Sequence, residues 1–127
     1  MKVISTEKAP AAIGPYSQGI VAGDFFYASG QIAIIPETGQ IVEGGIEDQA
    51  RQVMKNIGAL LEAAGADYDK VVKTGCFLAD MNDFAAFNGI YGEYFTNNKP
   101  ARSCVAVKTL PKNVLCEVEV VAYLGND

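Results

Sequence analysis

The most restrictive feature of the sequence is an amphipathic stretch at residues 46–64 that lies between β-rich runs. Its apolar residues recur at spacings of three and four, the period of one helix face; they are Ile46, Ala50, Val53, Ile57, Leu60, Leu61 and Ala64. Glu47 and Asp48 stand in the first turn, where the helix dipole favours acids, and Gly65 is placed to end the helix. The pattern predicts a helix over residues 46–64 with one buried face.

β-rich runs on both sides of this helix predict the other elements. Strands are expected at residues 25–29, 71–78, 103–108 and 114–123, with a strand end at Gly30, an extended segment at 31–35 and a further strand at 2–5 left open. Prolines and glycines at residues 10–19 predict a loop. A second helix is expected between a cap at Asp80 or Asn82 and a stop at residues 97–100, with an aromatic stripe formed by Phe84, Phe87, Tyr91, Tyr94 and Phe95.

The order of these elements indicates the fold class. Strands and helices do not alternate strictly, so a doubly wound fold is disfavoured. We expect an α/β chain of the α+β type, with a mixed sheet and both helices packed on one of its faces. A chain of 127 residues is most simply a single domain spanning residues 1–127.

Composition excludes several classes of function. Ten Lys and Arg against 15 Asp and Glu give a net charge of −5, which argues against a nucleic-acid surface. The chain has no histidine, which excludes histidine-dependent catalysis and histidine-ligated metals, and no metal is expected. No apolar run of about 18 residues exists, so no membrane contact is expected. Three cysteines without paired spacing are typical of reduced thiols, and the expected location is cytoplasmic.

The last two strands carry the most unusual side chains. Strand alternation places Glu117 and Glu119 on one face of an otherwise apolar strand. If Val107 pairs with Val114 in a hairpin, Arg102 lies opposite Glu119 and diagonal to Glu117. An Arg beside a Glu suits a small carboxylate substrate, because the guanidinium holds the anion by two bonds and the Glu handles a water. A cross-strand salt bridge on a solvated face explains the same pattern.

Other candidate residues also have an ordinary structural explanation. Tyr16 and the segment Ser29-Gly30-Gln31 either line a pocket or are ordinary turn residues. Asn88 lies inside the aromatic stripe and is either a buried amide bonded to backbone or a pocket group. Cys104 stands two residues from Arg102, the one cysteine near a cation, and burial in a strand explains it as well.

In combination, five segments of the chain resemble the RidA family, also called YjgF or UK114. They are Ala9–Gly19, Ser29–Gln31, Pro100–Val105, Leu110–Lys112 and Glu117–Glu119. The resemblance implies a chorismate-mutase-like fold and a homotrimer, with sheets around a central barrel and ligands bound in clefts between subunits. It also implies a cofactor-free hydrolase that converts 2-imino acids, such as 2-iminobutanoate and 2-iminopropanoate, to 2-oxo acids and ammonia. Such imines arise from PLP-dependent dehydration of threonine and serine.

The resemblance further implies a role for each site residue. Arg102 would hold the substrate carboxylate, and Glu117 would position the attacking water. Periodicity alone does not choose Glu117 over Glu119, whose role stays open between structure and catalysis. The remaining pocket residues would be Gly30 and Cys104, through their backbones, and Tyr16, Ser29 and Asn88.

Two other classes of function compete with this enzyme. One is a non-catalytic module that binds small carboxylates and acts in regulation; it would hold 2-oxobutanoate without speeding imine loss. The other is the ribonuclease or translation inhibitor activity attached to some animal members of the family. The lack of histidine and the charge of −5 argue against the latter.

Overall fold

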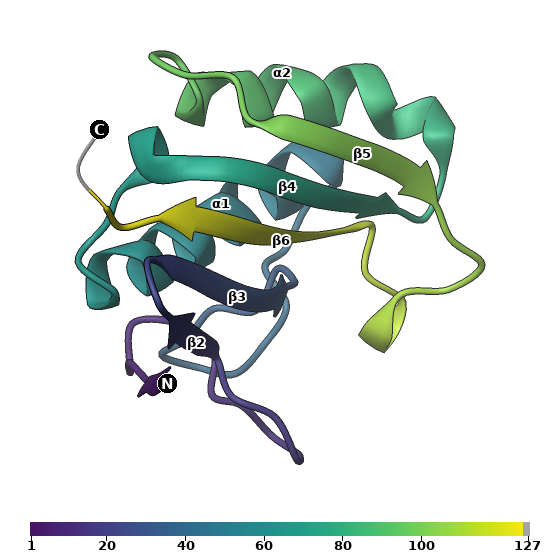
Figure 1. Ribbon diagram of the computed structural model, residues 1–127. Helices are drawn as coiled ribbons and strands as arrows, with labels where there is room; N and C mark the ends of the chain where they lie inside the picture. The colour runs from purple at the N-terminus through teal and green to yellow at the C-terminus, as the bar shows by residue number, and fades with distance from the viewer. Residues whose placement is uncertain (126–127) are drawn as a thin grey trace.

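Over residues 1–125, which the computed structural model describes, the chain forms a six-stranded sheet and two helices (Figure 1). The strands are β1 (Lys2–Ile4), β2 (Gly19–Ala22), β3 (Phe25–Gln31), β4 (Val71–Leu78), β5 (Ala101–Ala106) and β6 (Cys116–Tyr123). Their order across the sheet is β1-β2-β3-β6-β4-β5, antiparallel except for the parallel pair β4–β5. Both helices, α1 (Ile46–Ala63) and α2 (Phe84–Tyr94), lie behind the sheet in Figure 1, which confirms the predicted mixed sheet with one covered face.

Helix α1 matches its predicted bounds to within one residue. Its apolar stripe is buried against the sheet, with Ala50, Val53, Ile57, Leu60 and Leu61 at most 1% exposed. After the last turn Gly65 adopts a φ of 78°, the left-handed conformation that glycine permits at a helix end. Within residues 1–125, neither helix has the length and apolar character needed to cross a membrane.

Helix α2 follows a short 3-10 turn at Met81–Asp83. Asp80 caps this turn, because its carboxylate accepts the N–H of Asn82 at 2.8 Å. The prediction that Asp80 or Asn82 caps the helix itself is wrong, because the residue before α2 is Asp83 and its side chain makes no capping hydrogen bond.

The aromatic stripe is divided between two environments. Phe87 and Phe95 are buried at no more than 3% exposure, and Tyr94 packs on Tyr68. Phe84 and Tyr91 lie against the Arg102 side chain of β5 and take part in the site described below.

Strand β6 lies at the centre of the sheet, paired antiparallel with β3 on one side and β4 on the other. Alternate residues of β6 pack under the helices and are at most 2% exposed; they are Cys116, Val118, Val120 and Ala122. Glu117 and Glu119 therefore occupy the opposite, helix-free face of the sheet. The predicted division of this strand into a buried face and an acidic face is confirmed.

The predicted hairpin between the last two strands is wrong. Strand β4 lies between β5 and β6 and pairs with both of them. Arg102 lies beside Thr74 in the parallel pair. Glu119 lies beside Gly75 in the antiparallel pair. The predicted pairing of Arg102 with Glu119 or Glu117 across a hairpin is therefore also wrong.

The crossover through α2 explains this difference. A strand followed by a helix and a second strand of the same sheet returns parallel to the first, as β4-α2-β5 does. The chain after β5 stays bound to the end of β4, because the Val107 N–H donates to the Leu78 carbonyl at 2.9 Å. The connection to β6 then contains a 3-10 turn at Pro111–Asn113, in which Lys112 and Asn113 have φ values of 57° and 55°. Neither feature is visible in a β-rich run.

The N-terminal strands also differ from the prediction. The sequence does not predict β2, since a strand of four residues that begins at Gly19 carries a weak β signal. Strand β3 does not end at Gly30 but continues to Gln31, and the rest of the expected segment 31–35 contributes one isolated bridge between Ile34 and Ile41. The strand left open at residues 2–5 is present as β1.

Asn56 ties α1 to the segment that follows β3. Its side chain is 1% exposed, and its amide group donates to the carbonyls of Ile32 and Ile34 at 3.1 and 2.9 Å. The Asn56 carbonyl oxygen accepts from Gln52 at 3.0 Å. The Ile32 carbonyl also accepts the Ile34 N–H at 2.9 Å, so the Asn56 amide is its second donor. For the Ile34 carbonyl, which belongs to no strand, the Asn56 amide replaces a ladder partner.

Replacing Asn56 should therefore destabilise the fold. We expect Asn56→Ala to lower the free energy of unfolding by about 2–4 kcal/mol, because the Ile34 carbonyl loses its donor, the Ile32 carbonyl loses one of two donors, and a small cavity forms. Gln52→Ala, the control on the same helix, should cost less than about 1 kcal/mol. Urea unfolding of both variants measures the difference, and equal losses would contradict the assigned role of Asn56.

Candidate functional site

Four of the predicted site residues line one cavity of about 610 Å³, here called the Glu117 cavity. They are Tyr16, Ser29, Gly30 and Glu117. The rest of the wall is mostly apolar, with three further polar side chains; it consists of Pro10, Ala11, Ile13, Gln18, Gln31, Ile32, Ile34, Pro111 and Lys112. The Tyr16 side chain is 55% exposed in the loop before β2. This cavity therefore combines one carboxylate with an apolar wall and an exposed phenol.

An irregularity in β3 allows Glu117 to reach this cavity. The pairing of β3 with β6 is interrupted between Ala28 and Gln31, which marks a β-bulge at Ser29 and Gly30. The Glu117 carboxylate lies directly against Gly30, and a Cβ atom at that position would collide with Oε2 of Glu117. Glycine at this position leaves room for the Glu117 carboxylate, which any larger residue would displace.

Buried hydrogen bonds hold the Tyr16 loop against the bulge. The Gln18 side chain is 5% exposed; its oxygen accepts from the Thr6 N–H at 2.6 Å, and its amide donates to the Pro10 carbonyl at 2.7 Å. The Ser29 N–H donates to the Gln18 carbonyl at 2.9 Å, and the Ser29 hydroxyl donates to the Ser17 carbonyl at 2.6 Å. The Ser29 hydroxyl proton is thus engaged in the fold, and only the lone pairs of its oxygen remain for a ligand.

Arg102 and Asn88 line a second cavity of about 390 Å³ between α2 and β5, here called the Arg102 cavity. The Arg102 Nη1 donates to Oδ1 of Asn88 at 2.7 Å, and the guanidinium carbon lies 4.7 Å from the ring centre of Tyr91. No carboxylate of residues 1–125 forms an ion pair with Arg102. Lys99 also lines this cavity, so its walls carry two cations and no acid. The arrangement suits an anion.

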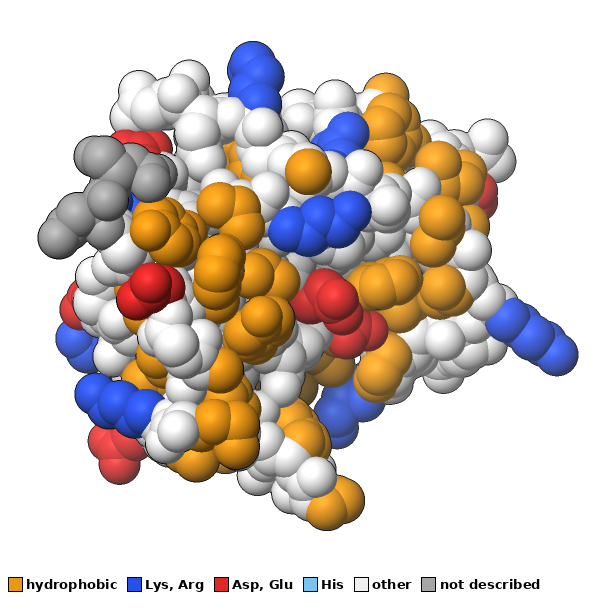
Figure 2. Space-filling view, in the orientation of Figure 1, with side chains coloured by type: hydrophobic (Ala, Val, Ile, Leu, Met, Phe, Trp, Pro, Cys, Tyr) orange, Lys and Arg blue, Asp and Glu red, His pale blue; other side chains and the backbone are white. Residues whose placement is uncertain are grey.

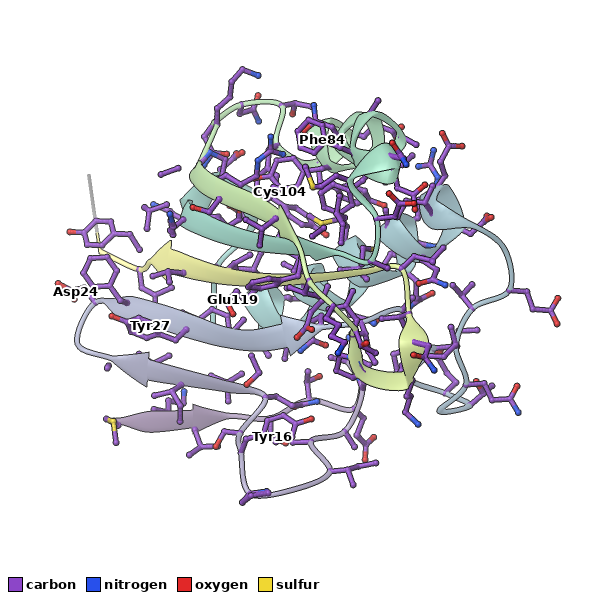
Figure 3. The ribbon with its side chains drawn as sticks, turned by 90° about the vertical axis from the view of Figure 1, so that its right-hand side faces the viewer. Tyr16, Asp24, Tyr27, Phe84, Cys104 and Glu119 are labelled. Carbon is purple, nitrogen blue, oxygen red and sulfur yellow. The ribbon has the colours of Figure 1, made fainter. Side chains whose placement is uncertain are left out.

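The two cavities lie on different faces of the sheet. Arg102 pairs in register with Thr74, which is fully buried under the helices, whereas Glu117 occupies the helix-free face. In Figure 3, Cys104 of β5 lies near Phe84 of α2, while Glu119 lies farther down on β6. One chain therefore brings Tyr16, Ser29, Gly30 and Glu117 together, and separately Asn88, Arg102 and Cys104.

The surroundings of Glu117 and Cys104 raise the pKa of both groups, with different consequences. Burial raises the pKa of Glu117 above its ordinary value of 4.5, and the charge of Glu119 raises it further. Burial also raises the pKa of the Cys104 thiol, although the nearby Arg102 partly opposes the shift. Cys104 therefore stays protonated at neutral pH and lacks the thiolate that a nucleophile needs. Among residues 1–125, no three His, Cys, Asp or Glu side chains cluster closely enough to hold a metal ion.

Sequence reasoning missed two kinds of residue near these cavities. Tyr91 and Phe84 were expected only as members of the core stripe, yet both rings lie beneath the Arg102 guanidinium. Their spacing from Asn88, at three and four residues, is the signal that could have placed them beside it. Gln18 and Lys112, which line the Glu117 cavity, lie in segments that carry the family resemblance, but no role at the site was predicted for either of them.

The chain is similar to several known proteins over nearly its whole length. Residues 6–124 match the family model described as Endoribonuclease L-PSP. The chain is 57% identical to a RutC family protein of Pyrococcus horikoshii over 122 residues, which cover 96% of this chain and 97% of that protein. It is 51% identical to the human 2-iminobutanoate/2-iminopropanoate deaminase over 124 residues, which cover 98% of this chain and 90% of that protein. The structure of E. coli TdcF with bound serine is similar at a TM-score of 0.94 and 41% identity, covering 98% of this chain and 100% of that one.

These matches extend over nearly the whole chain at identities far above those at which a fold alone is shared. The chain belongs to the Endoribonuclease L-PSP family, the group to which the sequence resemblance assigned it as RidA. The predicted family is therefore confirmed.

The raised pKa of Glu117 makes stability depend on pH in a defined direction. The folded state binds the proton more tightly than the unfolded state, so the stability present below pH 4.5 is lost as the pH rises through the folded pKa. We expect Glu117→Gln to raise the melting temperature at pH 7 and to leave it nearly unchanged below pH 4.5. Differential scanning calorimetry at both values tests this, and a lower melting temperature at pH 7 would show that the ionised carboxylate is stabilising.

Proposed function

We propose that the protein hydrolyses 2-imino acids, such as 2-iminobutanoate and 2-iminopropanoate, to 2-oxo acids and ammonia. The observation that carries the proposal is the Arg102 guanidinium, which is held by Asn88 and has no ion-pair partner in residues 1–125. A guanidinium presented in this way binds a carboxylate by two parallel hydrogen bonds. The activity for which the human relative is named and the serine bound to the E. coli relative support a substrate built like an amino acid.

The chemistry requires few groups from the protein. A protonated imine is already electrophilic at C2. The protein therefore needs only to orient a water molecule and to carry one proton from that water to the leaving nitrogen. Water adds to C2 and gives one proton to Glu117, which leaves a neutral carbinolamine. The carbinolamine nitrogen takes this proton back, the C–N bond breaks to release ammonia, and the hydroxyl loses its proton to Glu117 as the C2 carbonyl forms. Glu117 is the group suited to orient this water and carry the proton, because its partly desolvated carboxylate has a raised pKa and faces a cavity. No cofactor takes part in this scheme.

We further propose that the complete site forms between subunits of a homotrimer. Arg102 and Glu117 lie on different faces of one chain's sheet, so they can meet only across an interface. The helix-free face carries exposed apolar side chains on several strands, among them Val3, Phe25, Tyr27 and Val105. Figure 2 shows hydrophobic side chains gathered on this face, and the outer edge of β5 is unpaired. A partner chain would cover both features.

The competing function is a non-catalytic module that binds small carboxylates. The Arg102 cavity alone supports it, because it needs an anion site and no acid. The Glu117 carboxylate, placed in a cavity by the glycine at position 30, favours the enzyme. We also propose that these imines come from PLP-dependent dehydration of threonine and serine in the cytoplasm, the source that the family resemblance implies.

Two substitutions should separate binding from catalysis. Arg102→Ala should lower kcat/KM by at least about 30-fold, a loss of roughly 2–4 kcal/mol of carboxylate binding. Arg102→Lys should also have a low kcat/KM, because lysine cannot form two parallel hydrogen bonds to the carboxylate.

Glu117→Gln should keep 2-oxobutanoate binding and lower kcat by about 100-fold. Release of 2-oxo acid from enzymatically generated imine, together with calorimetry of 2-oxobutanoate, measures both effects. Glu119→Gln is the matched control and should keep kcat.

The outcomes distinguish the candidate functions. Wild-type protein that binds 2-oxobutanoate but does not accelerate imine hydrolysis would be the binding module. Loss of kcat in Glu119→Gln with full activity in Glu117→Gln would move the water-orienting role to Glu119.

Mixing two inactive variants tests the shared site. In an oligomer formed from Arg102→Ala and Glu117→Gln chains, some interfaces join the intact Arg102 of one chain to the intact Glu117 of the other. Random mixing should restore about a quarter of the wild-type activity, provided that the site lies between copies. Co-refolding from denaturant followed by light scattering and activity measurement makes the comparison. A monomer mass, or no recovery in mixed trimers, would overturn the interfacial site.

A further inference from the structure

We propose that Tyr91 is a positioning residue for Arg102. Its ring packs against the guanidinium in a cation–π contact, and its hydroxyl is hydrogen-bonded to Thr74 in the sheet. The inference rests on the proposed function, in which Arg102 is the group that holds the substrate carboxylate. It adds a pair of residues, one on α2 and one on β4, that set the orientation of this cation before any ligand arrives.

The first observation is the contact between Arg102 and one face of α2. The guanidinium carbon lies 4.7 Å from the ring centre of Tyr91 and 5.5 Å from that of Phe84. Nη1 donates to Oδ1 of Asn88 at 2.7 Å. Residues 84, 88 and 91 are separated by four and three positions, so they form one row along the helix. This row gives the planar guanidinium cation two aromatic rings for cation–π contacts and one hydrogen-bond acceptor.

The second observation is that Tyr91 itself is fixed. Its side chain is only 7% exposed, and its hydroxyl lies 2.8 Å from the hydroxyl of Thr74, which is fully buried. The Phe95 ring packs 4.7 Å away and the Phe87 ring 5.9 Å away, centre to centre. A ring held at its tip and along its side cannot tilt, so the surface beneath Arg102 has a defined orientation.

Register connects the two observations. Thr74 is the neighbour of Arg102 in the parallel pair of β4 and β5, so the residue that anchors Tyr91 lies beside the residue that Tyr91 supports. A closed set of contacts therefore links β4, α2 and β5 through Thr74, Tyr91 and Arg102. Movement of β5 relative to α2 would break a hydrogen bond or a cation–π contact, and the set holds both elements together.

The expected consequence is a preorganised anion site. Fixing an arginine side chain costs up to about 2 kcal/mol of conformational entropy. A ligand that must order the side chain on binding therefore binds more weakly by that amount. Here Tyr91, Phe84 and Asn88 fix the side chain beforehand. The N–H groups that Asn88 leaves free lie in the guanidinium plane, away from the rings, where a carboxylate can accept from them.

Kinetics of four variants test the role. Tyr91→Leu removes the ring, Tyr91→Phe keeps the ring and removes the hydroxyl, and Thr74→Val removes the anchor. Tyr94→Leu is the control, because Tyr94 lies on the same helix and stacks on Tyr68 at 5.4 Å without touching Arg102. We expect Tyr91→Leu to raise KM and the 2-oxobutanoate dissociation constant about tenfold with little change in kcat, since anchoring acts equally in the ground and transition states.

The other variants should follow in order. Tyr91→Phe and Thr74→Val should raise KM by about two- to fivefold, less than Tyr91→Leu, because the ring remains but is less firmly held. Tyr94→Leu should lower the melting temperature and leave KM within about twofold of wild type. A KM for Tyr91→Leu within twofold of wild type, or an equal rise in Tyr94→Leu, would overturn the proposal.

A spectroscopic readout makes the test independent of turnover. The Arg102 Nε–H signal, assigned in a ¹⁵N spectrum by its loss in Arg102→Lys, should be shifted by the ring current of Tyr91 in the ligand-free protein. Tyr91→Phe should keep the shift and Tyr91→Leu should remove it. An Arg102 signal that is the same in wild type and Tyr91→Leu would overturn the proposal even if KM changed. Wild-type protein without imine hydrolysis would end the proposed function, whereas the spectrum would still decide the role of Tyr91.

A second variant covers the case in which Tyr91→Leu fails to fold. Phe84 is half-buried at the start of α2, so Phe84→Leu removes the other ring contact of Arg102 at smaller structural cost. It should raise KM by about threefold and shift the Arg102 signal. Absence of both changes in Phe84→Leu, together with wild-type behaviour of Thr74→Val, would refute the positioning row.

Discussion

The pairing of β6 with both β3 and β4 is the constraint on which the rest of the structure depends. Side chains of this strand alternate between the helix-covered core and the open face, and its four core residues are almost completely buried. A shift of register by one residue would turn Glu117 and Glu119 into the core without partners, at a cost of several kcal/mol each. The register is therefore strongly specified, and it delivers the Glu117 carboxylate to the bulge at Gly30.

Helix α2 serves both the core and the site because its aromatic side chains point in more than one direction. Phe87 and Phe95 pack into the core, while Phe84 and Tyr91 present their rings to Arg102 on the neighbouring strand. The same helix also creates the parallel crossover that places β5 at the edge of the sheet. An edge strand leaves one side of Arg102 open to solvent and to other molecules, which a central position would not allow.

Local patterns predicted what depends on local physics. The spacing of apolar residues gave α1, and the alternation of Glu117 with buried neighbours gave the two faces of β6. The pairing of β6 was mispredicted because β4 and β5 are equally suitable neighbours on composition. Only the path of the chain through α2 determines that β4 lies beside β6. The site residues were found largely through the family resemblance. The spatial separation of Arg102 from Glu117 follows from the sheet order, which no single segment contains.

Separation of the cation from the acid has a chemical advantage in the proposed enzyme. Were Arg102 and Glu117 neighbours on one strand pair, they would neutralise each other, the pKa of the acid would fall, and the guanidinium would lose donors to it. Held on different faces, Arg102 stays unpaired among residues 1–125 and Glu117 keeps a raised pKa. A 2-imino acid carries a carboxylate and a protonated nitrogen, so it is complementary to such a divided pair. In the proposed interface the substrate itself lies between the two charges, and each remains free until the substrate arrives.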